Sequence, residues 1–474
     1  MLWRPHNLYY EKFADGSVKC IEEEIPFELP NGWAWARLAS LIELFITGPF
    51  GSALHKSDYI TDGIPLINPM NIVDGKVIPI DKMQVSPETV KRLSSFKVAP
   101  NDIVIARRGD MGRCAVIQPA QKGWLCGTGS FILRIPAVLR SEFFAVCLRS
   151  PYSVEIMSGN SIGNTMLNLN QMILKSILMP VPPCAEQNRI INAVFDTDSL
   201  LATITAQSEE LVMRVKKTKS KILDLAIRGK LVPQDPSDEP ASVLLERIRA
   251  EKEELIKQGK IKRDKKESVI FKGEDNSYYL NDGQMTANIN DDLPFDIPVS
   301  WRWVRLKDVL IINPRNKLAD DLAVSFIPMA LIDDGYSGKH TAEVRKWNKV
   351  KTGFTHFADG DVGVAKITPC FENRKSAIFE NLANGYGAGT TELHVLRPYG
   401  KDILAQYLLS YVKSDYFIKT GTLTFTGDVG QQRISKEYVE AAYFPLPPIR
   451  EQKRIVQQIG AMFEYLDMIS DVLT

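Results

Sequence analysis

An internal repeat constrains the fold of this chain more than any other sequence feature. The segment Leu29–Leu38 recurs as Ile297–Leu306, and the segment Pro182–Ile190 recurs as Pro447–Ile455. Two further short matches lie between and before these in the same order, and all four are offset by about 260–270 residues. Ordered matches at a nearly constant offset indicate two copies of one structural unit.

The two copies share their borders but not their interiors. Residues 44–97 and 312–354 have almost no sequence in common, although the segments around them match. Equivalent frames around divergent interiors are typical of two similar modules that recognise two different targets. The pattern divides the chain into a first module at 1–183, a first long helix at 184–230, a linker with a short charged helix at 231–290, a second module at 291–448 and a second, shorter helix at 449–474.

A long helix is predicted after each Pro-Pro pair. At alternating spacings of four and three, eight of eleven positions from Ile190 to Leu225 are apolar, as are all six from Ile455 to Leu473. Amphipathic helices buried in a core are the alternative, but the length of the first seam favours a coiled coil. The first helix is expected from about residue 185 to residue 228, with Gly229 as its stop. Its length of about 65 Å exceeds one turn of B-DNA, which is about 34 Å.

Apolar, β-branched runs inside both modules predict strands. The runs Asp102–Ala106 and Ser130–Ile135 in the first module have counterparts at Asp361–Ala365 and Glu392–Leu396. The expected fold class is therefore α+β, with two strand-rich, mixed α/β domains separated by long coiled-coil helices and related by a pseudo-twofold repeat. The tryptophan pairs at the module entrances are expected in the core rather than stacked on bases.

Basic side chains gather at the predicted strand ends of both modules. Glycine beside arginine lets a backbone approach a phosphate while the guanidinium reaches a base edge, so these clusters indicate nucleic-acid binding. For any single residue, a surface salt bridge is an equally good interpretation. The DNA-binding candidates are Lys56, Arg107, Arg108 and Arg113 in the first module and Lys339, His340, Lys366, Arg374 and Lys375 in the second.

The net charge does not argue against such a function. There are 58 basic and 57 acidic residues, for a net charge of +1, but binding depends on local patches rather than on the sum. No apolar run is long enough to span a membrane. The cysteines and histidines lack metal-ligand spacing, so no metal site is expected.

No catalytic motif is present either. The chain has neither a phosphate-binding P-loop nor a G-x-S-x-G nucleophile elbow. The glycine-rich turn at 48–52 is a weak signal for a nucleotide, and the metal-dependent nuclease pattern around Asp361 and Lys366 is incomplete. A DNA-binding module is favoured. The alternatives are a self-sufficient methyltransferase or nuclease with unrecognised motifs, and a structural coiled-coil scaffold.

Over essentially its whole length the chain resembles the specificity subunits of type I restriction-modification enzymes. The resemblance rests on the two Pro-Pro-x-x-Glu-Gln-x-Arg-Ile segments, the entry Leu29–Trp33 and the linker Arg228–Pro236. The segments at 48–52 and 353–361 are similar to the variable domains of that family.

The resemblance implies a non-catalytic subunit that reads double-stranded DNA. Each variable domain, called a target recognition domain, would read one half of a split site, and the two helical regions would pair antiparallel and set the spacer. Two modification subunits would dock on these helices, and restriction subunits would complete the complex. S-adenosylmethionine, ATP and Mg²⁺ would belong to those partners, so no cofactor is expected in this chain, and the complex would be cytoplasmic.

The resemblance also draws attention to the starts of the two helices. The matching residues there are Glu186, Gln187, Arg189, Glu451, Gln452 and Arg454. They are expected to cap and pack the helices or to contact a modification subunit. The chain departs from the family in one respect: the second helix stops at Thr474, near the equivalent of Ser208, so the distal part of the first helix lacks a second copy as its partner. A complete spacer is therefore in doubt, as is docking of the second modification subunit.

Overall fold

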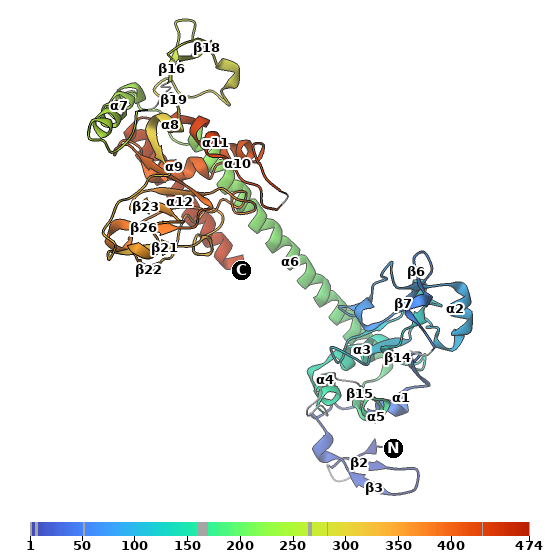
Figure 1. Cartoon of the computed structure of the whole chain (residues 1–474). Helices are drawn as coiled ribbons and strands as arrows, with labels where there is room; N and C mark the ends of the chain where they lie inside the picture. Colours follow the sequence, from blue (N-terminus) through green and yellow to red (C-terminus); the bar gives the residue numbers. More distant parts are fainter. Residues whose placement is uncertain are drawn as a thin grey trace. The chain divides into compact units, whose positions relative to one another are not determined.

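A computed structural model describes residues 2–4, 8–50, 53–159, 169–263, 268–281, 283–428 and 430–473 (Figure 1). Gly51 and Ser52 of the glycine-rich turn lie outside these residues, as do residues 264–266 of the expected linker. The chain forms two compact units, at 1–204 and 205–474, and their border falls inside one long helix. Within the described residues, no helix combines the length and the apolar character that crossing a membrane requires.

The first unit consists of small sheets around one central four-stranded sheet, whose strand order is β12-β11-β14-β5. A second four-stranded sheet has the order β13-β7-β10-β6, and a two-stranded sheet joins β15 to β4. The strands of the first unit are β1 (Leu2–Trp3), β2 (Tyr10–Lys12), β3 (Val18–Cys20), β4 (Ala34–Arg37), β5 (Leu44–Thr47), β6 (Tyr59–Ile60), β7 (Ile64–Ile67), β8 (Ile72–Val73), β9 (Lys76–Val77), β10 (Gln84–Val85), β11 (Ile103–Ala106), β12 (Cys114–Val116), β13 (Leu125–Cys126), β14 (Ser130–Arg134) and β15 (Leu178–Val181).

The second unit has the same kinds of sheet. Its central sheet has the order β20-β27-β24-β25, its second sheet the order β22-β21-β26-β23, and β19 pairs with β28. The strands are β16 (Val269–Lys272), β17 (Tyr278–Asn281), β18 (Thr286–Asn288), β19 (Arg302–Arg305), β20 (Leu310–Ile312), β21 (Ala323–Ile327), β22 (Glu343–Lys346), β23 (Thr355–Ala358), β24 (Val362–Ala365), β25 (Ser376–Ile378), β26 (Tyr386–Gly389), β27 (Leu393–Pro398) and β28 (Tyr443–Leu446).

The strand orders show that the central sheets share one topology, whereas the second sheets do not. In both central sheets the order along the chain is the same, and all pairs are antiparallel. In both second sheets one pair is parallel, β13 with β7 and β21 with β26. The rest of the second sheets differs, because β13 is an edge strand whereas β26 lies between β21 and β23. Residues 44–97 and 312–354 therefore differ in strand arrangement as well as in sequence.

Several helices also have a counterpart in the other unit. The helices of the first unit are α1 (Leu38–Leu41), α2 (Pro87–Arg92), α3 (Ser141–Arg149), α4 (Pro151–Ser158) and α5 (Gln171–Ser176); those of the second are α7 (Ala241–Lys257), α8 (Leu306–Val309), α9 (Ala405–Val412), α10 (Asp415–Thr422), α11 (Lys436–Ala441) and α12 (Ile449–Leu473). Trp301 and Trp303 are buried in the second unit, whereas Trp35 is buried and Trp33 half-buried in the first.

Part of the stretch interpreted as a linker belongs to the second unit. The apolar side of α7, which includes Leu244 and Ile248, joins the largest core cluster of that unit. Strands β16, β17 and β18 form a small sheet that covers Trp303. The sheet β1-β2-β3 is its counterpart in the first unit, which explains the sequence match near the N-terminus.

The long helix α6 spans Cys184–Ile227. Gly229 follows it with a φ of +67°, and the Lys230 amide donates to the Leu225 carbonyl, which is a glycine-based helix stop. In the second unit, the part of α6 from residue 205 onward packs antiparallel to α12. Ser208 donates a hydrogen bond to the carbonyl of Leu473, and Lys219 forms an ion pair with Asp467 and lies over the Phe463 ring.

Candidate nucleic-acid interface

The strongest DNA-binding candidates lie in equivalent loops of the two units. In the first, residues 107–113 connect β11 to β12, and in the second, residues 366–375 connect β24 to β25. Both loops connect an inner strand of the central sheet to an edge strand. The two ends of each loop are therefore held by the buried, antiparallel hydrogen bonding of that sheet. A loop on such a rigid support can position cations at its tip.

Arg107 and Lys366 occupy the same position at the two strand ends. The Arg107 amide donates to the Gly129 carbonyl, and the Lys366 amide donates to the Glu392 carbonyl. The carbonyls of Arg107 and Lys366 in turn accept hydrogen bonds from Leu169 and Ile434, at 2.8 and 2.9 Å. The backbone around each cation is therefore fixed in the same way, while the side chains are only half-buried.

The Arg107 side chain is partly desolvated. Its guanidinium carbon lies 5.2 Å from the centre of the Phe131 ring, and its Nε is buried without a hydrogen-bond partner among the described residues. Burial lowers the pKa of Arg107, and the charge of the neighbouring Arg108 lowers it further. A bound phosphate or base edge would supply the hydrogen-bond acceptor that this buried donor lacks.

Arg113 and Lys375 are also equivalent, but both are bound within their own units. Arg113 donates to the Pro69 carbonyl at 3.3 Å and forms an ion pair with Asp110. Lys375 donates to the carbonyls of Met329 and Ile332 at 3.1 and 2.8 Å. Each cation therefore holds a short 3-10 turn that follows a strand of the second sheet. Their role is structural.

The remaining candidates are dispersed. Arg108, Lys56 and Lys339 are exposed and form no ion pair with any described residue. Lys339 and His340 lie near the end of β25, whereas Lys366 lies near its start, because β24 and β25 are antiparallel and pair Val364 with Ser376. The structure thus does not place Lys339 and His340 beside Lys366.

His340 does not contribute a reliable positive charge. Its ring is half-buried, its Nε2 accepts a hydrogen bond from the Glu380 amide at 3.2 Å, and its ring centre lies 5.6 Å from that of Phe379. Burial lowers the pKa of His340 in spite of nearby carboxylates. The ring is therefore mainly neutral at neutral pH, and a role as a phosphate-binding cation is weakened.

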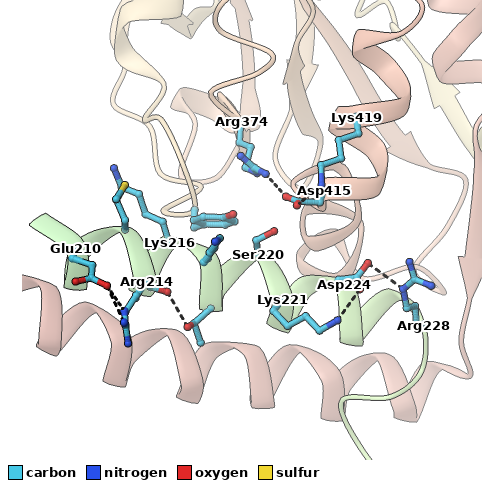
Figure 2. A pocket seen from close by; sticks show the side chains of 14 residues that line it. Glu210, Arg214, Lys216, Ser220, Lys221, Asp224, Arg228, Arg374, Asp415 and Lys419 are labelled. Carbon is cyan, nitrogen blue, oxygen red and sulfur yellow. Dashed lines mark hydrogen bonds and ion pairs between the residues drawn. The ribbon is translucent and has the colours of Figure 1, made fainter.

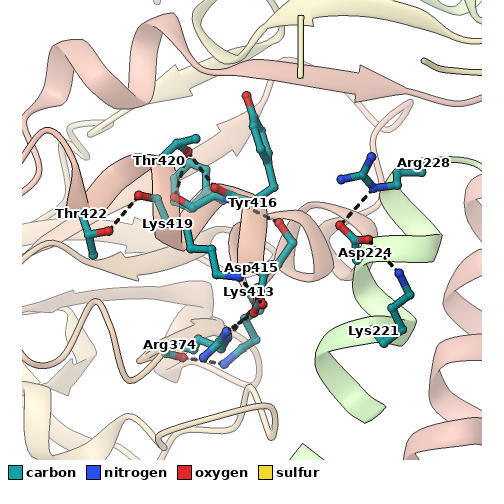
Figure 3. Close-up of polar contacts among 12 residues, drawn as sticks. Lys221, Asp224, Arg228, Arg374, Lys413, Asp415, Tyr416, Lys419, Thr420 and Thr422 are labelled. Carbon is teal, nitrogen blue, oxygen red and sulfur yellow. Dashed lines mark hydrogen bonds and ion pairs between the residues drawn. The ribbon is translucent and has the colours of Figure 1, made fainter. Parts of the chain in front are cut away.

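Arg374 faces a groove beside α6 rather than joining Lys375. It has a φ of +56°, its Nε donates to the Lys413 carbonyl at 3.0 Å, and it forms an ion pair with Asp415. Figure 3 shows this network, in which Lys413 also takes part. Arg374 and Lys375 are adjacent in the sequence, but their side chains contact different parts of the unit.

A buried ion pair braces each central sheet behind the loops. Asp102 accepts two hydrogen bonds from Arg134, at 2.7 and 2.8 Å, and one from the Ala99 amide. Asp361 accepts two from Arg397, at 2.8 and 2.7 Å, and one from the Ala358 amide. Both aspartates lie in matching segments of the sequence repeat. The signal that could have revealed the ion pairs is an arginine near the end of each following strand, Arg134 or Arg397.

The helix-start residues make repeated contacts within each unit. Trp33 Nε1 donates to Glu186 at 3.1 Å, and Trp301 Nε1 donates to Glu451 at 2.9 Å. Gln187 accepts from the Arg140 amide. Gln452 accepts from the Leu404 amide.

Both glutamines are fully buried, and each donates to the carbonyl of a proline before its own helix. These four acidic and amide side chains therefore join each helix to its module. Arg454 forms an ion pair with the buried Asp238. Arg189 is exposed.

The described residues contain no group of three or more His, Cys, Asp or Glu side chains arranged to hold a metal ion.

A family model described as type I restriction modification DNA specificity domain matches the chain twice, over residues 30–213 and 298–468. The EcoAI specificity subunit of Escherichia coli is 46% identical over 256 residues, which is 54% of this chain and 40% of that protein. The EcoEI specificity subunit of the same species is 44% identical over the same shares. The matched region thus covers well under two thirds of these relatives.

A chain solved in work on the assembly and conformational transition of the type I R-M system has a similar fold. It is 18% identical, with a TM-score of 0.52, and the match covers 94% of this chain and 96% of that one. The two family matches, one for each copy of the repeat, cover more than half of the sequence. This chain belongs to the family of type I restriction-modification DNA specificity domains.

Proposed function

We propose that this chain supplies DNA sequence specificity to a type I restriction-modification complex, with each unit reading one half of a two-part site on double-stranded DNA. The observation that carries the proposal is the pairing of two family matches with two units whose central sheets have the same strand order. Each unit also presents a cation, Arg107 or Lys366, at the same end of its central sheet.

The divergent interiors are the proposed reading elements. Base edges are read by side chains that enter a groove, whereas a frame only needs to hold those side chains in register. Residues 44–97 and 312–354 differ in sequence and in strand arrangement, but each lies beside a central sheet of the same topology, so they can present different side chains from equivalent supports. The Asp102–Arg134 and Asp361–Arg397 pairs brace these central sheets.

We further propose that the helices α6 and α12 set the spacer and dock two modification subunits. Exposed apolar side chains support this: Leu201 and Ile204 on α6, and Tyr465 and Ile469 on α12, are between 44% and 70% exposed. Such residues on a helix surface favour a protein partner. Restriction subunits would join this assembly in the cytoplasm. Catalysis, with S-adenosylmethionine, ATP and Mg²⁺, would belong to the partners, and this chain would carry no cofactor.

Sequencing of methylated bases in a host that expresses the chain with its modification subunit tests the proposal. We expect methylated adenines in a two-part motif with a fixed gap. Exchange of residues 312–400 for those of a relative should change one half of the motif and leave the other unchanged. A single continuous motif would contradict the two-part reading, and methyl transfer or cutting by the purified chain alone would favour a self-sufficient enzyme.

A further inference from the structure

A cationic groove in the second unit includes Arg374 from the β24–β25 loop. It has a volume of about 1220 Å³ and runs between residues 210–228, in and just after α6, and a wall that includes Tyr336 and α10. Figure 2 shows Arg374, Asp415 and Lys419 on this wall, opposite the side chains of α6. The basic residues of α6 that line the groove lie between the apolar positions of the seam.

The lining of the groove has a surplus of positive charge. Seven Lys and Arg side chains face three carboxylates. Asp224 is shared by Lys221 and Arg228, at 3.6 and 3.1 Å, and Asp415 is shared by Arg374 and Lys419. The carboxylates therefore neutralise fewer than half of the cations. Lys216 and Lys217 are exposed and form no ion pair with a described residue.

One wall of the groove is held in place. Arg374 is fixed by the Lys413 carbonyl and by Asp415, and it lies 5.2 Å from the centre of the Tyr336 ring. Burial tends to raise the pKa of Asp415, but hydrogen bonds from Ser220 and Lys419 and the charges of Arg374 and Lys419 lower it overall. Asp415 is therefore ionised at neutral pH and keeps Arg374 in position.

The other wall consists of long side chains that can move onto a ligand. The Arg214 and Lys221 side chains are 72% and 67% exposed. Exposed ion pairs of this kind are worth about 0–1 kcal/mol, so exchanging a carboxylate for an incoming anion costs little. Arg214, Lys217, Lys221 and Arg228 follow one another along one side of α6 over about 21 Å.

The chemistry of the groove fits a polyanionic backbone better than a peptide. Phosphates are bound by Arg, Lys, Ser, Thr and Tyr side chains, and the groove offers Thr218, Ser220 and Tyr336 beside its cations. The core of a protein interface is instead depleted of charge and rich in apolar anchors. About 21 Å along α6 corresponds to about six phosphates of one strand along the DNA axis.

We propose that this groove binds the phosphate backbone of the DNA and grips it without reading its sequence. The inference rests on the proposed function, since it assumes that the chain binds DNA through its recognition loops. It assigns to α6 a part in DNA affinity besides its part in spacing. The contact would add to binding on all sequences alike and would depend strongly on salt.

The test uses the full chain in complex with its modification subunit. In the triple variant Lys216→Gln, Lys217→Gln, Lys221→Gln, we expect binding to cognate and unrelated duplexes to weaken by the same factor, roughly 10- to 100-fold at physiological salt. The magnitude of the slope of log K against log salt concentration should decrease by about one for each lysine that contacts a phosphate. The methylated motif should stay the same.

A matched variant, Lys257→Gln, Lys260→Gln, Lys262→Gln, removes the same charge at and beyond the end of α7, outside the groove. It should bind DNA as the unchanged complex does. Three outcomes would each overturn the groove proposal. They are equal losses of DNA affinity in both variants, an unchanged salt slope in the groove variant, and a groove variant that fails to assemble with the modification subunit. Absence of sequence-specific binding in the unchanged complex would instead refute the proposed function.

Discussion

The two units differ most where they are proposed to read DNA and least where they hold themselves together. Their interiors share almost no sequence and their second sheets differ in strand order, yet the order of the central sheet and one parallel pair in the second sheet are the same. Their frames repeat individual hydrogen bonds, such as Trp33 to Glu186 and Trp301 to Glu451. A backbone plan thus tolerates extensive change of side chains as long as a few polar contacts and the buried strands remain.

The largest effect is expected at the buried ion pairs. Arg134→Met and Arg397→Met each leave a buried carboxylate without its partner, Asp102 or Asp361. We expect each to lower the free energy of unfolding by about 2–4 kcal/mol, somewhat less than for a fully buried pair because the guanidinium groups are partly exposed. Urea unfolding followed by tryptophan fluorescence measures this loss.

Lysine variants at the same two positions serve as controls. Arg134→Lys and Arg397→Lys keep the charge but lose the two parallel hydrogen bonds, so they should recover only part of the stability. A large loss in one unit and none in the other would break the equivalence of the two braces.

The buried glutamines give the second comparison. Gln187→Ala and Gln452→Ala should each cost about 1–3 kcal/mol, because each leaves a backbone amide and at least one carbonyl unsatisfied in a buried site. The two losses should be similar, since both side chains are fully buried. Thermal unfolding of the two variants checks this, and the exposed Asn188→Ala is a neutral control.

The glutamates beside them should not be equal. Glu451 is 1% exposed and accepts hydrogen bonds from Trp301 and Gln234, whereas Glu186 is half-buried and accepts one from Trp33. Glu451→Ala is expected to cost about 1–2 kcal/mol and Glu186→Ala less than about 1 kcal/mol. Denaturation of both variants in urea tests the difference, and equal losses would show that burial does not distinguish the two contacts.

The smallest effect is a pH dependence that only the second unit should show. Lys413 is buried and donates to the carbonyls of Gly335 and Arg374, and burial lowers its pKa to about 7. Arg149 has the same place before the next helix in the first unit, but it is exposed. Arginine keeps its charge throughout the accessible pH range.

The sign of this dependence follows from proton uptake on unfolding. Below about pH 7 both states hold the Lys413 proton, and the full cost of burying the charge is present. Between about pH 7 and 10.4 only the unfolded state holds it, so stability rises with pH, by about 1 kcal/mol from pH 7 to pH 8. The free energy of unfolding should be measured across this pH window. This rise with pH should be absent in Lys413→Met and present in Arg149→Met.

Much of the frame could be predicted from the sequence. The repeat indicated two units, the apolar seam indicated a helix that the structure places at Cys184–Ile227, and Gly229 marked its end. These features depend on local periodicity and on turn chemistry, which a sequence displays directly. The family resemblance rested on the same framing segments, and the two family matches include them in large part.

The candidate site was only partly predictable. Arg107 and Lys366 follow buried strands that match in the repeat, so their equivalence was visible in the sequence. The different surroundings of Arg374 and Lys375 were not visible, because they depend on Asp415 and on the Met329 carbonyl, which are 41 and 46 residues away.

By itself the sequence determined that this protein consists of two related modules, each followed by a helix, with interiors that differ. The tertiary structure decided which basic side chains remain available and which are bound within a unit, and it showed that the central sheets share a strand order whereas the second sheets do not. The physical reason is that a helix or a turn is encoded by neighbouring residues. The partner of a strand, or of a charged side chain, is chosen by long-range packing and hydrogen bonding, which no local pattern records.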